Sequence, residues 1–138
     1  MQPSDELKNI VLQNYRDHAT AGYSLEVVRR YYSHQDGVLF VGTDPKEWLQ
    51  GYEAIYRYVE STMGGGVKIE VEHLESWCEG PVGWTVDRIR LTLPDGTNVP
   101  VRHTHIFQKE GDAWKIVHTH VSAEILDEIL IKMVKQSG

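Results

Sequence analysis

Residues 98–122 carry the sequence NVPVRHTHIFQKEGDAWKIVHTHVS, and this stretch decides the fold class. It contains two strand-like runs, residues 98–109 and 113–122, separated by the turn signal Glu110–Gly111–Asp112. A short polar turn with glycine between two such runs is typical of a β-hairpin. We therefore predict two neighbouring antiparallel strands, each of which carries one His-Thr-His segment.

The strand pattern continues toward the N-terminus. Residues 67–72 alternate between apolar and charged side chains, which is typical of a strand with one face in water. The alternation breaks near His73–Leu74, where we expect a bulge or a strong bend. A further strand is predicted over residues 82–93, and Asp95–Gly96 turns the chain into residues 98–109. The second half of the chain is thus predicted to be a four-stranded antiparallel meander.

Three helices are predicted before this meander, because apolar residues recur there at helical spacing between cap and stop signals. Their predicted limits are Ser4 to Gly22, Ser24 to Asp36–Gly37, and Tyr52 to Gly64–Gly66. A short buried strand is predicted over residues 38–41, and Trp48 is placed in a turn. A last helix is predicted over residues 124–135, with an apolar stripe that must dock on the domain or on a second subunit.

This order of elements predicts an α+β fold, with the N-terminal helices packed on one side of a strongly curved antiparallel or mixed sheet. Long strands curl, so the helices would close one side of the sheet into a cone. The 138 residues are the length of one domain, with a core over about residues 4–122 followed by the C-terminal helix.

Composition excludes several classes of protein. The formal net charge of −6 repels phosphate backbones, so we expect no nucleic-acid partner. The single cysteine, Cys78, excludes an internal disulfide and suits a cytoplasmic location. The N-terminus is polar and acidic, unlike a signal peptide, and no apolar run is long enough for a membrane span.

Three stretches resemble the SnoaL-like proteins of the nuclear transport factor 2-like superfamily. Residues 51–55, GYEAI, resemble the start of the third helix in that family, and residues 42–45, GTDP, precede it. Residues 113–122, AWKIVHTHVS, are similar to the closing strand of the family. The resemblance implies the cone-shaped fold with an internal pocket, and it leaves open whether the protein is a cyclase, an isomerase, a dehydratase or a non-catalytic binding module.

Residues 89–92, IRLT, also resemble a strand of the association domain of calmodulin-dependent kinase II. The arginine of that motif faces the pocket in the related domain, and Arg90 matches it. Two further pocket arginines of that domain correspond to His105 and Val121 here, so its anion-binding set is not preserved. This resemblance implies a fold, a pocket and a tendency to oligomerise.

Strand alternation places Trp84, Arg88 and Arg90 on one face of the strand over residues 82–93. If that face lines the pocket, two arginines over an aromatic floor would attract a carboxylate or an enolate. The opposite face, which includes Asp87, would then suit a subunit interface. The alternative is that the arginines lie at the wet rim and pair with Glu70 or Glu72.

The histidines form two pairs, because His103 and His105 share one face of their strand and His118 and His120 share one face of the next. Strand register decides whether both pairs face the pocket. Inside it, His105 or His120 could act as a general base near neutral pH. The alternative is a structural histidine bonded to a backbone carbonyl, Tyr or Asp. The second pair belongs to the shared closing-strand motif, so the first pair is more informative about function.

A metal site is a further alternative, because His103, His105 and Glu110 resemble the first half of a cupin motif. The helix-rich N-terminal half and the position of Glu110 in a turn weigh against it. We predict no metal and no cofactor.

Aromatic side chains are predicted to complete the pocket. The predicted pocket residues are Tyr32, Trp48, Tyr52, Trp84, Arg88, Arg90, His103, His105, His118 and His120. The acidic residues Asp36, Asp44 and Asp87 have no clear inward assignment, and no Tyr-Asp pair is evident. This absence of an acid–base pair weakens the case for isomerase or epoxide hydrolase chemistry.

Two functions remain open. We favour a binding module whose pocket holds a small hydrophobic carbonyl or carboxylate compound. The alternative is a cofactor-free isomerase, cyclase or lyase in which a pocket histidine moves a proton and Arg90 holds developing negative charge. A homodimer is expected in either case, because the open face of such a sheet needs cover.

Overall fold

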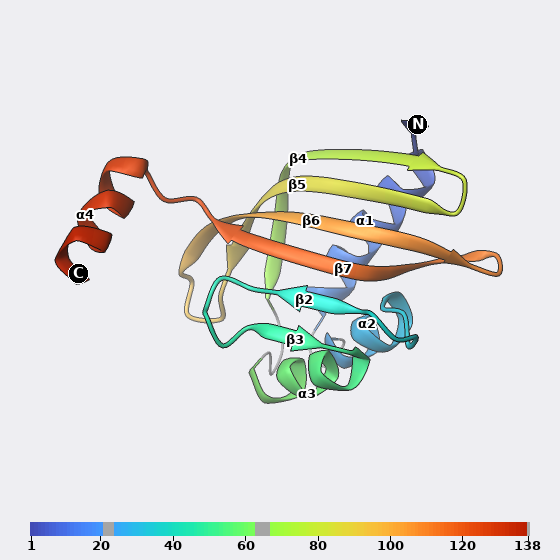
Figure 1. Ribbon diagram of the computed structural model, residues 1–138, viewed down its shortest axis with the longest axis horizontal. Helices are drawn as coiled ribbons and strands as arrows, with labels where there is room; N and C mark the ends of the chain where they lie inside the picture. The colour runs from blue at the N-terminus through green and yellow to red at the C-terminus, as the bar shows by residue number, and fades with distance from the viewer. Residues whose placement is uncertain (21–23, 63–66, 138) are drawn as a thin grey trace.

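The computed structural model describes residues 1–20, 24–62 and 67–137 as a curved mixed sheet of seven strands with helices behind it and at one edge (Figure 1). The strand order is β1-β4-β5-β6-β7-β2-β3. The strands are β1 (Gln2–Pro3), β2 (Leu39–Val41), β3 (Trp48–Gln50), β4 (Lys68–Glu79), β5 (Val82–Thr92), β6 (Asn98–Glu110) and β7 (Ala113–Ala123). The helices are α1 (Asp5–His18), α2 (Ser24–Tyr31), α3 (Tyr52–Thr62) and α4 (Asp127–Ser137). The predicted α+β fold is confirmed.

The four long strands β4 to β7 form the predicted antiparallel meander, and β7 then pairs in parallel with β2. The register between β4 and β5 shifts between Val71 and His73, next to the predicted bulge. Before the shift Val71 points to the inner face, and after it Leu74 and Ser76 do so. The extra residue bends the strand, and this bend helps the sheet to curl around the core.

Helix α1 packs across the inner face of the sheet against β4 and β5. Its cap is the predicted Ser4, whose hydroxyl oxygen accepts a hydrogen bond of 3.2 Å from the backbone N–H of Leu7. Leu7, Val11 and Tyr15 form its buried stripe. A Cβ atom on Gly83 would lie 2.3 Å from Cδ1 of Leu7, so the close contact between α1 and β5 requires glycine there.

Some predicted elements differ in the structure. Trp48 lies in the short strand β3 instead of a turn and is 61% exposed. Strand β1 was not predicted, because two residues carry no periodic signal. Gly22 and Gly64–Gly66, where two of the helices are predicted to end, lie outside the described residues. Helix α1 begins directly after the predicted cap Ser4 and α2 begins at the predicted Ser24, but α2 ends at Tyr31, before the predicted Asp36–Gly37.

Helix α4 stands away from the body of the molecule (Figure 1). None of its residues is buried, and its apolar side chains are exposed. The expected docking of this helix on its own domain is therefore wrong, and docking on a second subunit stays a prediction.

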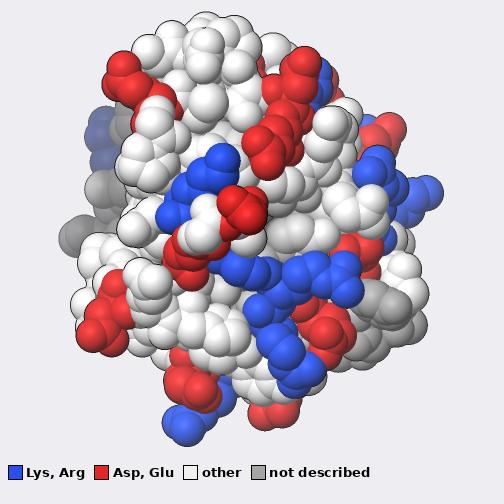
Figure 2. Space-filling view, turned by 90° about the vertical axis from the view of Figure 1, so that its right-hand side faces the viewer, with Lys and Arg blue, Asp and Glu red and all other residues white. Residues whose placement is uncertain are grey.

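On the end of the molecule that carries the β6–β7 turn, acidic side chains lie among the basic ones (Figure 2). Within residues 1–20, 24–62 and 67–137, none of the helices is long and apolar enough to cross a membrane.

Candidate functional site

A cavity of about 270 Å³ lies between the inner face of the sheet and the helices. Most of its wall is apolar and includes Val28, Ile55 and Val101. Its polar side chains come from α1, from the segment after α2, from the segment between β2 and β3, from α3, and from β6 and β7. They are Asn14, Tyr15, His18, Tyr32, Thr43, Glu47, Tyr58, His103, His105 and Thr119. A mostly apolar cavity with a few convergent polar groups is typical of a small-molecule site.

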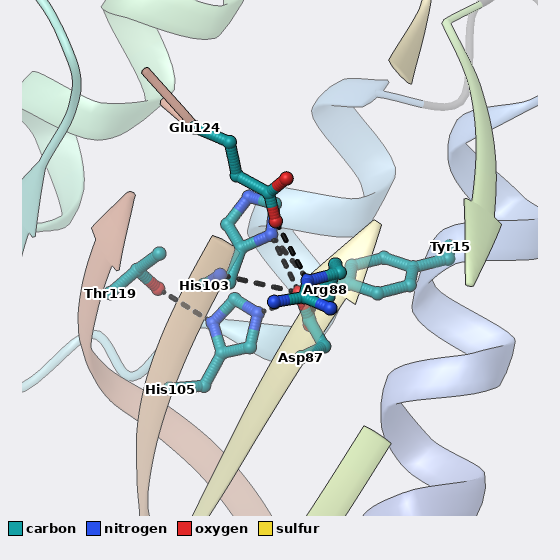
Figure 3. A network of polar contacts seen from close by, with 7 residues as sticks. All are labelled: Tyr15, Asp87, Arg88, His103, His105, Thr119 and Glu124. Atoms are coloured by element: carbon teal, nitrogen blue, oxygen red, sulfur yellow. Dashed lines mark hydrogen bonds and ion pairs between the residues drawn. The ribbon is translucent and has the colours of Figure 1, made fainter. Parts of the chain in front are cut away.

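The carboxylate of Asp87 on β5 lies at the centre of a polar network beside this cavity and is 3% exposed (Figure 3). The hydroxyl of Tyr15 donates a hydrogen bond to Oδ2 of Asp87. Oδ1 of Asp87 lies 3.1 Å from Nδ1 of His103 and accepts a bond of 3.3 Å from the backbone N–H of the same residue. Burial alone would raise the pKa of Asp87, but the contacts with His103, His105 and Tyr15 outweigh it and lower the pKa. Asp87 is therefore ionised at neutral pH.

The network continues from Tyr15 into the cavity wall. The Tyr15 hydroxyl oxygen lies 3.0 Å from Nε2 of His105, whose Nδ1 lies 2.9 Å from Oγ1 of Thr119. Oγ1 of Thr119 in turn lies 2.9 Å from the hydroxyl of Tyr32. Five side chains, from α1, β5, β6, β7 and the segment after α2, thus form one continuous chain of hydrogen bonds.

Counting donors fixes the direction of this chain. A carboxylate only accepts, so the single hydroxyl proton of Tyr15 points to Asp87, and the Tyr15 oxygen must accept the proton on Nε2 of His105. A neutral His105 then accepts at Nδ1 from the Thr119 hydroxyl, whose oxygen accepts from Tyr32. We assign His105 the Nε2–H tautomer on this basis.

Burial keeps most of the site uncharged. Burial, and then the neighbouring His103, lower the pKa of His105 to about 3. The same two causes lower the pKa of His18 to about 4. Burial and the negative charge of Asp87 raise the pKa of Tyr15 far above its usual value, and burial raises that of Tyr32 to about 12. At neutral pH these four side chains are therefore neutral beside one buried carboxylate.

The sequence profile of the SnoaL-like domain matches residues 10–126. The chain belongs to the SnoaL-like family. The resemblance seen in the sequence is therefore confirmed. Comparison with curated proteins finds no match.

Solved structures share the fold of this SnoaL-like domain. An NTF2-like protein of unknown function from Pseudomonas putida KT2440 has 18% identity over 90% of this chain and 88% of that chain, with a TM-score of 0.76. A candidate dehydratase of the NTF2-like family from Streptomyces avermitilis has 13% identity over 88% of this chain and 97% of that chain, with a TM-score of 0.73. A candidate calcium/calmodulin-dependent protein kinase II association domain from Xanthomonas campestris has 19% identity over 90% of this chain and 95% of that chain, with a TM-score of 0.69. At these identities the likeness shows the fold alone.

The SnoaL-like domain brings three of the predicted pocket residues to the cavity, Tyr32, His103 and His105. The two histidine pairs face opposite sides of the sheet: His103 and His105 point inward, whereas His118 and His120 lie in a shallow groove on the outer face. The cause is the register, which places His105 opposite Thr119 and not opposite a histidine. The other predicted residues outside the cavity lining are Trp48, Tyr52, Trp84, Arg88 and Arg90.

The predicted orientation of β5 is wrong. Its inner face carries Asp87 and Ile89, whereas Arg88 and Arg90 are exposed on the outer face. Arg90 forms an ion pair of 2.9 Å with Glu72, which is the alternative that the sequence left open, and Arg88 forms one of 2.8 Å with Glu124. The apolar alternation of Ile89 and Leu91 was a correct signal for the inner face. The similarity to an arginine-lined pocket favours the opposite face of β5, which the structure places outward.

Consequently Asp87 and Tyr15 form the Tyr-Asp pair that was not evident in the sequence. The sequence gives Asp87 no clear inward assignment and places it on the strand face that would suit a subunit interface if the arginines lined the pocket. Its partner Tyr15 lies 72 residues earlier in the chain. Hydrophobic periodicity does place both residues on buried faces, but it does not say which two side chains meet.

The alternative metal set of His103, His105 and Glu110 is not brought together by the fold. Glu110 accepts a hydrogen bond of 2.6 Å from Ser33, outside the lining of the cavity. The structure instead gathers Asp87, His103 and His105, with one potential ligand atom from each all within 4.8 Å of one another. The Tyr15 hydroxyl bonds to both Asp87 and His105, so a metal ion could bind the three ligands only if this hydroxyl moved.

Proposed function

We propose that this SnoaL-like domain binds a small, mostly hydrophobic molecule in the cavity and moves a proton on it, as a cofactor-free isomerase or lyase does. The observation that carries the proposal is the contact between ionised Asp87 and Nδ1 of His103 at the cavity wall. An apolar cavity beside an acid–base pair with a buried carboxylate and a partly buried imidazole supports proton transfer more than passive binding.

His103 would be the base in this proposal. Asp87 accepts from Nδ1–H and thereby leaves the lone pair of His103 on Nε2. Nε2 makes no hydrogen bond to the residues that the structure describes, and the His103 side chain lines the cavity. In contrast, both ring nitrogens of His105 already have partners, and His120 faces outward. His103 therefore suits the role that the sequence had given to His105 or His120.

The proton balance of such a step is simple. Nε2 of His103 would take a proton from the carbon next to a carbonyl group, which leaves an enolate and an imidazolium paired with Asp87. Return of a proton to the same or another carbon regenerates the neutral imidazole. Asp87 stabilises the imidazolium that forms and holds the ring in position.

Hydrogen–deuterium exchange on a ketone tests this proposal without knowledge of the natural substrate. The protein is incubated with 2-tetralone in D2O, and loss of the proton signal at the carbon beside the carbonyl is followed by NMR. We expect saturable exchange above the buffer rate, and a loss of about 100-fold or more in His103→Gln and Asp87→Asn, since a general base typically contributes about 10²–10⁴-fold.

The control variant is His120→Gln, because His120 lies on the outer face of the same sheet and should leave the exchange rate unchanged. Exchange at the buffer rate despite saturable binding of 2-tetralone would contradict proton transfer. That result would favour the binding module without turnover.

A further inference from the structure

Asn14 is a buried polar side chain that the hydrogen-bond network does not use. It lies on α1, is 5% exposed and lines the cavity. Its carboxamide makes no hydrogen bond to any residue that the structure describes, whereas the neighbouring Tyr15 is bonded to Asp87 and His105. The polar atoms of this amide stay accessible from the cavity and have no partner among the described residues, so they can bond to a ligand or to water there.

The charges around the cavity limit what that ligand can be. Asp87 is ionised beside the cavity, and Glu47 is a second carboxylate in its lining. None of the described lining residues is a lysine or an arginine. The two arginines expected to attract an anion lie on the outer face, where Glu72 and Glu124 already pair with them. A carboxylate inside the cavity would therefore meet like charge without a compensating cation.

We propose that the Asn14 carboxamide holds the oxygen of a neutral carbonyl ligand and that the cavity rejects carboxylates of the same shape. This inference rests on the proposed function and narrows its substrate class from carbonyl or carboxylate compounds to neutral carbonyl compounds. Asn14 offers an N–H donor from the α1 wall, and His103 lies on the sheet wall. A bound ketone would thus have its oxygen on the helix side and its acidic C–H on the sheet side.

The same amide suits the charge that develops in the reaction. As the proton leaves carbon, negative charge grows on the carbonyl oxygen, and a fixed N–H donor stabilises an enolate more than a ketone. Asn14 remains neutral, so it does this without the desolvation cost of a buried cation.

Three probes of the same ring skeleton test the inference by calorimetric titration near pH 7. They are tetralin, which has no polar group, 2-tetralone, which is a neutral ketone, and tetrahydro-2-naphthoate, which is an anion. For the wild type we expect 2-tetralone to bind about tenfold more tightly than tetralin, which is the fold-change that one satisfied buried amide typically gives. The anion should bind more weakly than tetralin.

Two variants separate the roles of the residues. Asn14→Leu should remove the preference for 2-tetralone over tetralin while tetralin still binds, which also shows that the variant is folded. Asp87→Asn should allow tetrahydro-2-naphthoate to bind about tenfold or more tightly than it binds to the wild type, because the repelling charge is gone. An unchanged preference in Asn14→Leu, or wild-type binding of the anion as tight as that of the ketone, would overturn the inference.

The failure of the inference and that of the proposed function give different results. Equal wild-type binding of tetralin and 2-tetralone would remove the role of Asn14 but leave a ligand-binding cavity. Binding of none of the three probes would contradict the proposed function and the inference with it.

Discussion

The hydroxyl oxygen of Thr119 lies 2.9 Å from Nδ1 of His105, and this contact belongs to the hydrogen-bond chain that runs from Tyr32 to Asp87. Because Asp87 only accepts hydrogen bonds, every proton in the chain is oriented toward it. A shift of every proton along its own hydrogen bond would protonate Asp87, leave Tyr32 deprotonated and reverse the direction of the chain. The chain could therefore carry a proton between two positions of the cavity wall.

The tautomer of His105 is the first testable consequence. We expect ¹⁵N NMR to show a neutral Nε2–H imidazole for His105 at pH 7 and down to about pH 4, because burial lowers the pKa of this residue to about 3. Thr119→Val removes the donor to Nδ1 and should broaden or shift the ¹⁵N signals of His105, whereas Thr119→Ser should preserve them. An Nδ1–H tautomer in the wild type would contradict the assigned direction of the chain.

Acid should begin to destabilise the fold at a pH well above the range in which carboxylates usually titrate. The pKa values of His18 and His105 fall from about 6.5 in the unfolded chain to about 4 and 3 in the fold, so below pH 6.5 the unfolded state binds more protons. Stability is therefore present at pH 7 and lost as the pH falls. We expect the free energy of unfolding in urea to drop by about 3–4 kcal/mol between pH 7 and pH 5.

His18 provides the matched control for that titration. The variant His18→Gln removes one of the two buried groups, so the loss of stability between pH 7 and pH 5 should fall to roughly half. Equal free energies of unfolding at the two pH values in the wild type would contradict a folded state with both imidazoles neutral.

The sequence predicted the long elements because each carries its own periodic signal. Ser4 marks the start of α1, and the alternation over residues 67–72 together with its break predicts β4 and its bulge. Strand β3, with Trp48, has only three residues and owes its existence to pairing with β2, which local pattern does not encode. The exposed position of Trp48 follows from that pairing.

The site was predicted only in part, because its decisive contacts are between distant residues. The sequence singled out His103 and His105 from residue type and shared face. It did not identify Asp87 as a site residue, because the similarity to an arginine-lined pocket favoured the other face of β5. It did not identify Asn14 and Tyr15 either, because the sequence does not show whether a buried helical residue lines a cavity or packs in the core. Strand register and cavity shape, which join these residues, emerge only in the fold.

Gly83 should be intolerant of a side chain. A Cβ atom there would lie 2.3 Å from Cδ1 of Leu7 and 2.9 Å from the carbonyl oxygen of Trp77. Gly83→Ala should therefore push α1 from β5 and lower the free energy of unfolding by about 1–3 kcal/mol, as overpacking does. Val82 is 49% exposed, so Val82→Ala is the control and should change stability by less than about 0.5 kcal/mol. Equal stability of the two variants would contradict the close packing at Gly83.

Arg88 and Arg90 should be dispensable for ligand binding. Both side chains are exposed on the outer face and pair with carboxylates there, so water and salt screen them from the cavity. Arg88→Ala and Arg90→Ala should each change the 2-tetralone dissociation constant by less than about twofold and the free energy of unfolding by less than about 1 kcal/mol. A loss of binding of tenfold or more in Arg90→Ala, measured by the same titration, would restore the arginine-lined pocket.

Helix α4 should be part of a homodimer interface. Seven apolar side chains are exposed on α4, which stands away from its own domain, and on the two residues just before it: Ile125, Leu126, Ile129, Leu130, Ile131, Met133 and Val134. A contiguous apolar surface of this kind is unfavourable in water and typically marks an interaction site. We expect light scattering to give twice the chain mass at micromolar concentration.

The variant Ile129→Asp/Leu130→Asp places two charges in this apolar surface and should convert the dimer to a monomer. Lys132→Ala leaves the seven apolar side chains in place and should remain dimeric, so it shows that a change of charge on the same helix does not by itself break the dimer. A monomeric wild type at micromolar concentration would contradict the dimer itself. A double variant that stays dimeric would instead place the interface on another surface. The strand arrangement offers the open outer face of the sheet for this role.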